Sequence, residues 1–378
     1  MPEHILITGG AGFIGSRLAR RFVEAGHRVS VLDSLIAQVH GPDPVHTSPL
    51  LASLDGIANV HHGSVTDDDD LRTALAGATI VVHLAAETGT GQSMYEIERY
   101  VETNVGGTAK LLDLLANESH EVSRVVIASS RSIYGEGAYR TEDGRTVYPP
   151  HRTDADMSRG DFEVHLEGEG ELALVPTDED AKLHPSSVYG ITKQMQESLV
   201  RTVAPTLGVE AVALRYQNVF GPGQSLKNPY TGILSIFSTL IRQGKEINIF
   251  EDGKESRDFV YIDDVVEATF LAATSAAAAG HVFNVGSGRA TTVLEVVDSL
   301  RTAFGIQVPA RVTGNYRLGD IRHNVADTTR LTEILGFTPN VPFGEGVRRF
   351  VDWVLTEPVE GDSYQRSLDE MAHRKLLK

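Results

Sequence analysis

Short apolar runs alternate with helix-like patterns along the first half of the chain. The first run, Ile5–Ile7, is typical of a buried strand, and in the stretch Phe13–Gly26 apolar positions recur at helical spacing. Further strands are predicted at Arg28–Leu32, Asn59–Val65, Thr79–Ala86, Arg124–Ser130 and Glu210–Tyr216, and further helices at Asp67–Ala76, Tyr95–Asn117 and Ser187–Thr206. This alternation predicts an α/β fold with a parallel, doubly wound sheet.

The pattern changes after Tyr216, where turn signals break the chain into shorter elements. Residues 221–223 and 228–230, rich in glycine and proline, mark loops. Beyond them, helices are predicted at Gly232–Arg242, Asp263–Ala273, Thr292–Phe304, Thr328–Leu335 and Gly344–Leu355, and strands at Ile247–Phe250, Phe259–Ile262 and His281–Val285. The polar tail from Glu357 is expected to be frayed.

These patterns divide the chain into two predicted domains. Residues 1–216 and 246–285 would form the sheet domain. Residues 217–245 and 286–378 would form a smaller C-terminal α/β domain over the carboxyl ends of the strands.

The stretch Glu136–His184 interrupts the alternation and shows no clear period. Its middle, Asp154–Asp180, carries ten acidic residues and one basic residue, Arg159. Structureless loops beyond roughly fifteen residues are uncommon, so we expect an inserted segment, about residues 137–183, that forms a lid or hairpin. Its strands would be Phe162–Leu166 and Glu171–Val175. A solvated acidic flap is the alternative. Between Ser34 and Gly56 we expect a long loop with one helical turn.

Composition narrows the possible functions. The chain has 378 residues and a formal net charge of -17, which argues against non-specific binding to nucleic acid or to an anionic membrane. It has no cysteine, which excludes disulfides and thiolate metal sites, and we predict no metal centre. No apolar run reaches membrane-spanning length, and the first strand begins close to Met1. We therefore expect a cytoplasmic protein without a signal peptide.

A glycine-rich turn joins the first strand to the first helix. It reads Thr8-Gly9-Gly10-Ala11-Gly12-Phe13-Ile14-Gly15. The glycines permit a tight turn and let backbone amides approach a pyrophosphate at the helix N-terminus. The second strand ends in Asp33, about twenty residues on, where a carboxylate binds the ribose hydroxyls of adenosine. Together these features predict a nicotinamide-type dinucleotide on a Rossmann sheet.

Tyr189 and Lys193 lie four residues apart, on one face of a predicted helix. A phenol has a pKa near 10, so it is a poor base at neutral pH unless nearby positive charge stabilises the phenolate. The Lys193 ammonium and an oxidised nicotinamide would supply that charge, and lowering the pKa to about 7 requires roughly 4 kcal/mol. Alone, such a pair is usually solvated. In a chain that also carries a dinucleotide-binding turn, the pair predicts that Tyr189 is a general base.

Three motifs together resemble the extended, nucleotide-sugar-modifying branch of the short-chain dehydrogenase/reductase superfamily. They are the glycine turn, Tyr189-x-x-x-Lys193, and Ala128–Gly135, which contains Ser130 at a strand end. The resemblance covers nearly the whole chain and implies that Ser130, Tyr189 and Lys193 are catalytic. It also implies that NAD is bound by Gly9, Gly12, Phe13, Ile14, Gly15, Asp33, Ser64, Val65, Leu84, Ala85, Ala86, Asn104, Ala128, Tyr189, Lys193 and Tyr216.

The second half of the chain resembles the sugar-nucleotide site of that family. Leu214–Pro222 is similar to a segment whose asparagine, here Asn218, binds the diphosphate, and Arg257 and Arg317 match arginines on the phosphates. A guanidinium suits a phosphate because its donors are planar and always charged, and surface salt bridges are the alternative role. The implied substrate-binding residues are Thr88, Ser130, Arg131, Tyr189, Asn218, Gly232, Ile233, Asn248, Phe250, Arg257, Arg317 and Asp320.

The chain also departs from the family pattern. Ser64 stands where relatives often have an aspartate on the adenine amine, and Arg131 stands directly after Ser130, at an alanine or serine position. The acidic insertion is absent from compact galactose-type epimerases. It is similar to an insertion in dTDP-L-rhamnose 4-epimerases, as is the segment Asn228–Leu234.

The resemblance implies NAD-dependent epimerisation of a nucleotide-diphosphate sugar at C4, through a 4-keto intermediate. Alternatives on the same fold are a 4,6-dehydratase or decarboxylase, and a non-catalytic NAD-sensing protein. The resemblance also implies a homodimer in which the helices Tyr95–Asn117 and Ser187–Thr206 pair across a two-fold axis.

Overall fold

Seven parallel strands form the central sheet of the computed structural model, which describes residues 2–226, 228, 232–359 and 363–378. Their order across the sheet is β3-β2-β1-β4-β5-β9-β13. They are β1 His4–Thr8, β2 Arg28–Asp33, β3 Asn59–His62, β4 Ile80–His83, β5 Arg124–Ser130, β9 Glu210–Tyr216 and β13 Val282–Val285. The strand order reverses at β1, which confirms the predicted doubly wound Rossmann sheet and creates a crevice at the carboxyl ends of β1 and β4.

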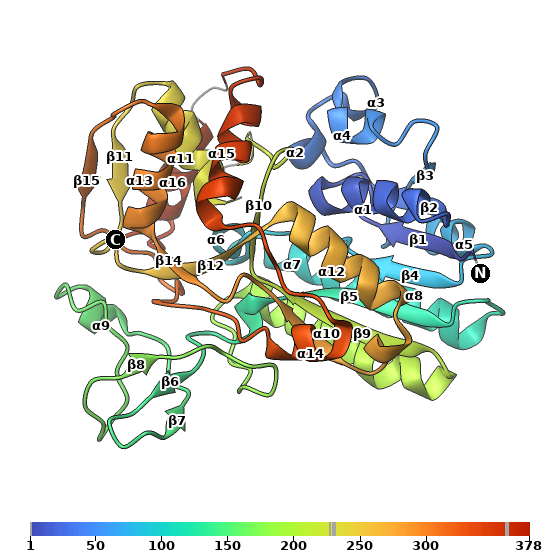
Figure 1. Cartoon of the computed structure of the whole chain (residues 1–378), viewed down its shortest axis with the longest axis horizontal. Helices are drawn as coiled ribbons and strands as arrows, with labels where there is room; N and C mark the ends of the chain where they lie inside the picture. The colour runs from blue at the N-terminus through green and yellow to red at the C-terminus, as the bar shows by residue number, and fades with distance from the viewer. Residues whose placement is uncertain (1, 227, 229–231, 360–362) are drawn as a thin grey trace.

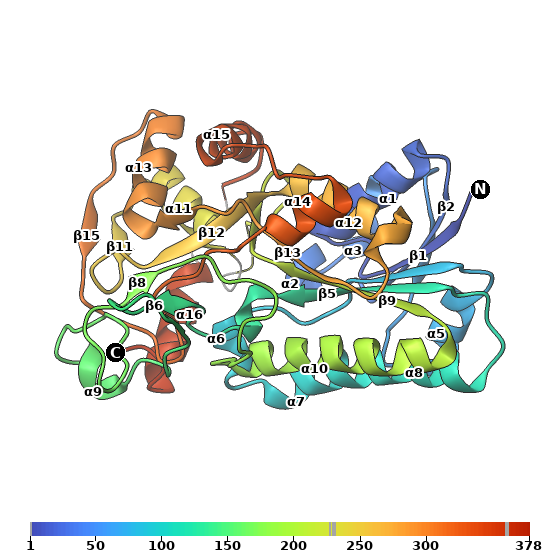
Figure 2. The same ribbon diagram turned by 60° about the horizontal axis from the view of Figure 1, so that its bottom comes forward.

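Helices cover both faces of this sheet (Figures 1 and 2). One face carries α1 Phe13–Glu24, α12 Ile262–Thr274 and α14 Thr329–Leu335, and the other carries α5 Asp68–Leu75, α8 Gly107–Asn117 and α10 Val188–Val203. Ile5 and Ile7 of β1 join the core that contains Leu18 of α1, whereas Leu6 joins the core that contains Val200 of α10. Successive strand residues point to opposite faces, so β1 is buried on both sides.

A second group of elements faces the carboxyl ends of the strands (Figure 1). Its strands are β10 Asn218–Phe220, β11 Ile247–Ile249, β12 Ser256–Tyr261, β14 Ala290–Thr292 and β15 Ala310–Val312, and its helices are α11 Ile233–Arg242, α13 Val293–Phe304 and α15 Phe343–Val354. β12 pairs with both β10 and β14, and β11 pairs with β15. The aromatic rings of Phe220, Phe259 and Phe343 pack together. They belong to the same hydrophobic core as Leu18 of α1.

The inserted segment forms a small antiparallel sheet of order β7-β6-β8. Its elements are β6 Tyr139–Arg140, β7 Thr146–Val147, α9 Asp154–Met157 and β8 Ala173–Leu174. The predicted strand Phe162–Leu166 is wrong, and of Glu171–Val175 only Ala173–Leu174 is a strand. Strands of two residues are too short to leave a period-two pattern in the sequence.

The long helix predicted at Tyr95–Asn117 is divided. It consists of α7 Ile97–Tyr100, a π-helical stretch Val101–Gly106 and α8. The loop after β2 contains three short helices instead of one turn, namely α2 Ala37–His40, α3 Pro44–Thr47 and α4 Pro49–Ala52. The remaining short helices are α6 Thr90–Ser93, Arg131–Ile133, Ala204–Leu207 and Ala276–Ala278.

Part of the tail is helical where the sequence predicts fraying. It forms α16 Ser363–His373, in which Leu368 and Met371 are buried, and Tyr316 and Lys378 exchange two backbone hydrogen bonds beyond it. Residues 229–230 of the predicted loop 228–230 lie outside the described residues. Within the described part of the chain, no helix combines the length and the apolar composition needed to span a membrane.

Candidate active site

The glycine-rich turn lies between the carboxyl ends of β1 and β4. Gly9 has a φ of +69°, and a Cβ atom on it would lie 2.8 Å from the amide nitrogen of Ala85. A Cβ atom on Gly15 would lie 2.5 Å from Cα of Gly10. Because neither position has a side chain, the turn can lie against the end of β4 at Gly9, and α1 can lie against the turn at Gly15.

Asp33, at the end of β2, braces this turn. One of its carboxylate oxygens accepts a hydrogen bond from the Ala11 amide at 2.9 Å, and the other accepts one from the Leu35 amide at 2.9 Å. α1 begins after Gly12, and no side chain caps its first amides. Uncapped amides at a helix N-terminus attract anions, so the turn fits the pyrophosphate of a dinucleotide. The acidic residue Asp33 lies beside the turn.

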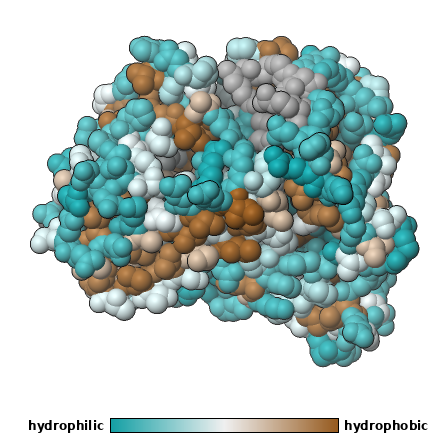
Figure 3. Space-filling model, turned by 180° about the vertical axis from the view of Figure 1, so that it is seen from behind, coloured by the Kyte–Doolittle hydropathy of each residue, from teal (hydrophilic) through white to brown (hydrophobic). Residues whose placement is uncertain are grey.

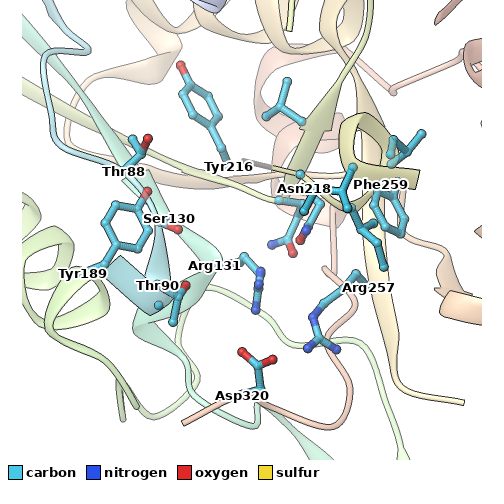
Figure 4. Close-up of a pocket in the computed structure, with 18 of the residues that line it drawn as sticks. Thr88, Thr90, Ser130, Arg131, Tyr189, Tyr216, Asn218, Arg257, Phe259 and Asp320 are labelled. Carbon is cyan, nitrogen blue, oxygen red and sulfur yellow. The ribbon is translucent and has the colours of Figure 1, made fainter. Parts of the chain in front are cut away.

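A cavity of about 460 Å³ opens beside the turn, between the sheet and the second group of elements (Figure 4). All the predicted substrate-binding residues line it. The predicted residues in its lining are Ile14, Leu84, Ala86, Thr88, Ala128, Ser130, Arg131, Tyr189, Lys193, Tyr216, Asn218, Gly232, Ile233, Asn248, Phe250, Arg257, Arg317 and Asp320. Residues that are far apart in the sequence therefore meet around one space of the size that small-molecule sites have.

The other predicted cofactor-binding residues lie outside this lining. They are Gly9, Gly12, Phe13, Gly15, Asp33, Ser64, Val65, Ala85 and Asn104. The buried Asn104 side chain accepts a hydrogen bond from the Glu87 amide at 2.7 Å and donates to Thr192 Oγ1 at 3.0 Å. The Ser64 hydroxyl bonds to Thr66 at 2.8 Å. Both side chains connect neighbouring segments, and a contact of either with the cofactor stays a prediction.

One face of α10 meets the end of β5. The residues on this face, at four-residue spacing, are Tyr189, Lys193 and Glu197. Lys193 Nζ donates to the carbonyl oxygen of Ala128 at 2.9 Å, and Ser129 Oγ donates to Glu197 at 2.6 Å. The Ser130 hydroxyl lies beside the Tyr189 phenol (Figure 4). Three consecutive residues of β5 thus contact three successive turns of α10.

Burial and nearby charges shift the pKa values of Tyr189 and Lys193. Burial raises the pKa of the Tyr189 phenol, and the Ser130 hydroxyl and the Arg131 guanidinium partly offset that effect. Burial also lowers the pKa of Lys193 to about 7. The sequence predicts that Lys193 is the protein cation acting on the phenol. In the structure the Arg131 guanidinium also favours the phenolate, and Lys193 Nζ donates to the Ala128 carbonyl, so the action of Lys193 on the phenol stays a prediction.

Three arginines and an aspartate form another part of the cavity wall. Arg257 donates to two main-chain carbonyls of residues 321–322 at 2.8 and 3.0 Å, and Arg317 pairs with Asp320 at 2.9 Å. Burial and the Arg257 charge lower the pKa of Arg131 to about 9, so it stays charged at neutral pH. Burial opposes ionisation of Asp320, but the arginines hold its pKa below the usual value. This local positive charge suits an anionic ligand.

Several other polar residues of the lining were not predicted from the sequence as site residues. They are Gln217, Gln224, Glu251, Glu255 and Thr291. Among the described residues, the buried side-chain oxygens of Gln217, Gln224, Asn218 and Asn248 have no hydrogen-bond partner. Buried polar atoms are rarely left unpaired, so each of these oxygens can accept a hydrogen bond from a bound molecule or water after a small adjustment of the wall.

Comparison with known proteins identifies the family. The model of the NAD dependent epimerase/dehydratase family matches residues 5–154 and 167–286. The chain belongs to this family. It is therefore an NAD-dependent enzyme, and the glycine turn and Asp33 fit that cofactor. The unmatched residues between the two parts, 155–166, fall in the inserted segment.

Individual relatives are similar over nearly their whole length. A dTDP-L-rhamnose 4-epimerase of Burkholderia thailandensis is 36% identical over 362 residues, which cover 94% of this chain and 96% of that protein. The structure of UDP-glucose 4-epimerase from Thermotoga maritima with UDP-glucose has a TM-score of 0.74 at 29% identity and covers 93% of this chain and 99% of that one. The UDP-glucose 4-epimerase of Thermus thermophilus in complex with NAD has a TM-score of 0.73 at 26% identity and covers 94% and 100%. The resemblance to nucleotide-sugar 4-epimerases is confirmed.

Proposed function

We propose that this enzyme epimerises a nucleotide-diphosphate sugar at C4 through a 4-keto intermediate. The observation that carries the proposal is the buried Tyr189 phenol beside the Ser130 hydroxyl, at the cavity and on the helix that also carries Lys193. A base and a hydroxyl donor held together suit the removal of a proton from a sugar hydroxyl. The similarity to a dTDP-L-rhamnose 4-epimerase and to two UDP-glucose 4-epimerases supports the same reaction.

In this proposal each residue acts on one oxygen, that of the sugar C4 hydroxyl. Tyr189 removes its proton while Ser130 orients the oxygen by donating a hydrogen bond. Bound NAD supplies the hydride acceptor and donor. Arg131 favours the phenolate of Tyr189, and Lys193 orients the ribose of the cofactor. After the flat 4-keto sugar has turned over, Tyr189 returns its proton to the same oxygen.

Elimination of the C6 hydroxyl, as in a 4,6-dehydratase, would need different residues. An acid must protonate the leaving hydroxyl and a base must take the C5 proton. The positions directly after Ser130 hold Arg131 and Ser132, and a guanidinium does not deprotonate while an alcohol is a weak acid. We therefore favour epimerisation over dehydration. The presence of both Tyr189 and Lys193 favours an enzyme over an NAD-sensing protein.

We further propose that the arginine-containing wall binds the nucleotide. Asn218 and Arg257 would bind the diphosphate, and Phe250 would pack against the base. Arg317 and Asp320 would bind phosphate and ribose. The unpaired oxygen of Asn218 supports this assignment, and so does the gathering of arginines in a chain of net charge -17.

We propose a two-domain division close to the predicted one, with the second boundary moved because β11 and β12 pair with strands of the second group. Residues 1–216 and 262–285 would bind NAD, and the sugar nucleotide would lie between this domain and residues 217–261 and 286–378. We also propose a homodimer in the cytoplasm, formed through α10 and the helical stretch before α8. Exposed apolar residues on these helices support the dimer: Ile97, Val101, Ile191 and Met195. Figure 2 shows α7, α8 and α10 side by side, and Figure 3 shows hydrophobic side chains gathered on the face seen from behind. Exposed apolar patches often mark interfaces.

A panel of UDP-, dTDP-, GDP- and CDP-sugars tests the reaction. Each sugar is incubated with the NAD-loaded enzyme in heavy water and followed by NMR and mass spectrometry. We expect inversion at C4, without loss of water and without deuterium at C5. Loss of water would indicate a dehydratase, and loss of carbon dioxide from a sugar acid would indicate a decarboxylase. An enzyme that binds NAD but turns over no sugar would favour the sensing role.

A further inference from the structure

Arg152 is a residue of the inserted segment whose side chain is buried against the cavity wall. This side chain is 1% exposed. Its Nη1 and Nη2 atoms donate to the two carboxylate oxygens of Glu251 at 2.8 and 2.9 Å. Nη2 also donates to the main-chain oxygen of Asp320 at 2.8 Å, and Nη1 to that of Phe162 at 3.0 Å. One guanidinium thus joins three segments that are far apart in the sequence.

Two of the partners outside the insertion belong to the cavity wall, while a third, Glu136, lies 3.5 Å from Arg152 Nε. Glu251 and Asp320 both line the cavity, and Glu251 directly follows Phe250. Glu251 has a φ of +48°, a left-handed conformation that is costly for a residue with a side chain. Its amide donates to the carbonyl of Asn315 at 2.7 Å. The bonds to its carboxylate and main chain hold this turn, and the turn sets the place of the Phe250 ring.

A second arginine, Arg322, connects the same segments. Its fully buried guanidinium donates to Glu163 of the insertion at 2.6 Å and to Asp252 at 2.7 and 2.9 Å. It also donates to Glu251 at 3.2 Å, and its main-chain amide donates to Glu136 at 2.7 Å. An acid of the insertion therefore pairs with a buried cation across the junction.

This network distinguishes between the roles considered for the insertion. Buried charges that lose their partners remain desolvated, so separating them is costly. A lid that opened in each turnover would break the bonds from Arg152 to Glu251 and Asp320. A solvated flap would not place a guanidinium at 1% exposure. The contacts instead make the insertion a fixed part of the wall.

We propose that Arg152 is a positioning residue for nucleotide-sugar binding, through which the insertion holds Phe250 and Asp320 in place. The proposal rests on the proposed function, because it takes this cavity to bind a nucleotide-diphosphate sugar. Arg152 acts through Glu251 and the main chain of Asp320. Binding of NAD at the glycine turn should not depend on it, since no contact of Arg152 involves that turn among the described residues.

The test compares Arg152→Met with a matched control, Arg159→Met. Arg159 lies in the same insertion, and its side chain is 66% exposed and pairs with Asp156. Isothermal titration calorimetry measures the affinity of wild type and variants for NAD and for UDP, dTDP, GDP and CDP. In Arg152→Met, the Kd of the diphosphate that wild type binds should rise about tenfold or more. This is the change in affinity that corresponds to the free energy of one charge-assisted hydrogen bond. The Kd for NAD should stay unchanged, and Arg159→Met should match wild type for every ligand.

Kinetics and a conservative variant separate positioning from a general structural role. With the sugar substrate, Arg152→Met should raise KM and change kcat little, because the lost interaction is made equally in the ground and transition states. Arg152→Lys keeps the charge beside Glu251 but lacks the rigid fork that reaches both partners. Its diphosphate affinity should fall between those of wild type and Arg152→Met.

The outcomes distinguish this inference from the proposed function. Equal diphosphate affinity in wild type and Arg152→Met would overturn the inference and leave the proposed function standing. A wild type that binds none of the four diphosphates would show that the nucleotide site itself is wrong, and the inference with it. Loss of NAD binding in both Arg152→Met and Arg152→Lys would make Arg152 a residue needed for folding, which also overturns the positioning role.

Discussion

Replacing Lys193 by methionine should abolish turnover and yet stabilise the NAD-free protein. Burial lowers the pKa of Lys193 from 10.5 to about 7, whereas in the unfolded chain the ammonium regains its ordinary value. At 1.36 kcal/mol per pH unit, this difference makes Lys193 destabilise the fold by about 4 kcal/mol at pH 7. The bond from Nζ to the Ala128 carbonyl stabilises by about 1.5 kcal/mol in return. We therefore expect Lys193→Met to raise the free energy of unfolding at pH 7 by about 3 kcal/mol.

The effect depends on pH in a defined direction. Below about pH 7 Lys193 is protonated in both folded and unfolded chains, so its full destabilisation is present. As the pH rises from about 7 towards 10.5, the folded chain is neutral at this site while the unfolded chain still binds a proton. The free energy of unfolding of wild type should therefore rise with pH across this window, whereas Lys193→Met lacks this rise. The stability advantage of the variant should shrink accordingly.

Urea denaturation of the NAD-free proteins at a series of pH values measures this difference. Lys182→Met, at an exposed position, is the control and should show no comparable change. If Lys193→Met is less stable than wild type at pH 7, the cost of burying an ammonium does not dominate at this site. A stability difference that stays constant from pH 7 to 10 would also refute the reasoning.

Three further predictions concern the base, its electrostatics and the assembly. Tyr189→Phe should lose at least about a hundredfold in turnover and still bind NAD, because only the proton-transfer group is removed; near-wild-type steady-state turnover would rule out this base. Arg131→Met should move the acidic limb of the pH–rate profile up by about one pH unit or more, since loss of the cation raises the pKa of Tyr189 further; an unmoved limb would contradict that role. Light scattering at micromolar concentration should give a dimer, and Ile191→Asp, on an exposed apolar position, should give a monomer; a monomeric wild type would exclude the interface.

The elements around the glycine turn are the best predicted from the sequence. β1, α1 and β2 begin within one residue of their predicted starts, because a buried strand, an amphipathic helix and a glycine motif each leave a strong local pattern. β5 and β9 coincide with the predicted ranges Arg124–Ser130 and Glu210–Tyr216. Of the predicted substrate-binding residues, Ser130 and Arg131 line the cavity because parallel strands bring their carboxyl ends to one edge, whereas residues such as Phe250 and Arg257 reach it from the second group of elements.

The insertion and the charges of the site could not be predicted in the same way. β6, β7 and β8 have two residues each and leave no period. The pair Arg152–Glu251 joins residues 99 positions apart, so only the folded chain reveals it. Likewise, the spacing of Tyr189 and Lys193 indicates a shared helix face but not that Lys193 bonds to Ala128. Long-range pairing of this kind depends on tertiary packing rather than on local pattern.

A nucleotide sugar deuterated at C4 tests the proposed chemistry most directly. The sugar that turns over in the panel is labelled, converted in ordinary water and analysed by NMR and mass spectrometry. If the hydrogen leaves C4 and returns to the opposite face of the same carbon, the product is inverted at C4 and keeps its deuterium there, and this is the result we expect. Deuterium transferred to C6, or lost to water, would contradict oxidation and re-reduction confined to C4.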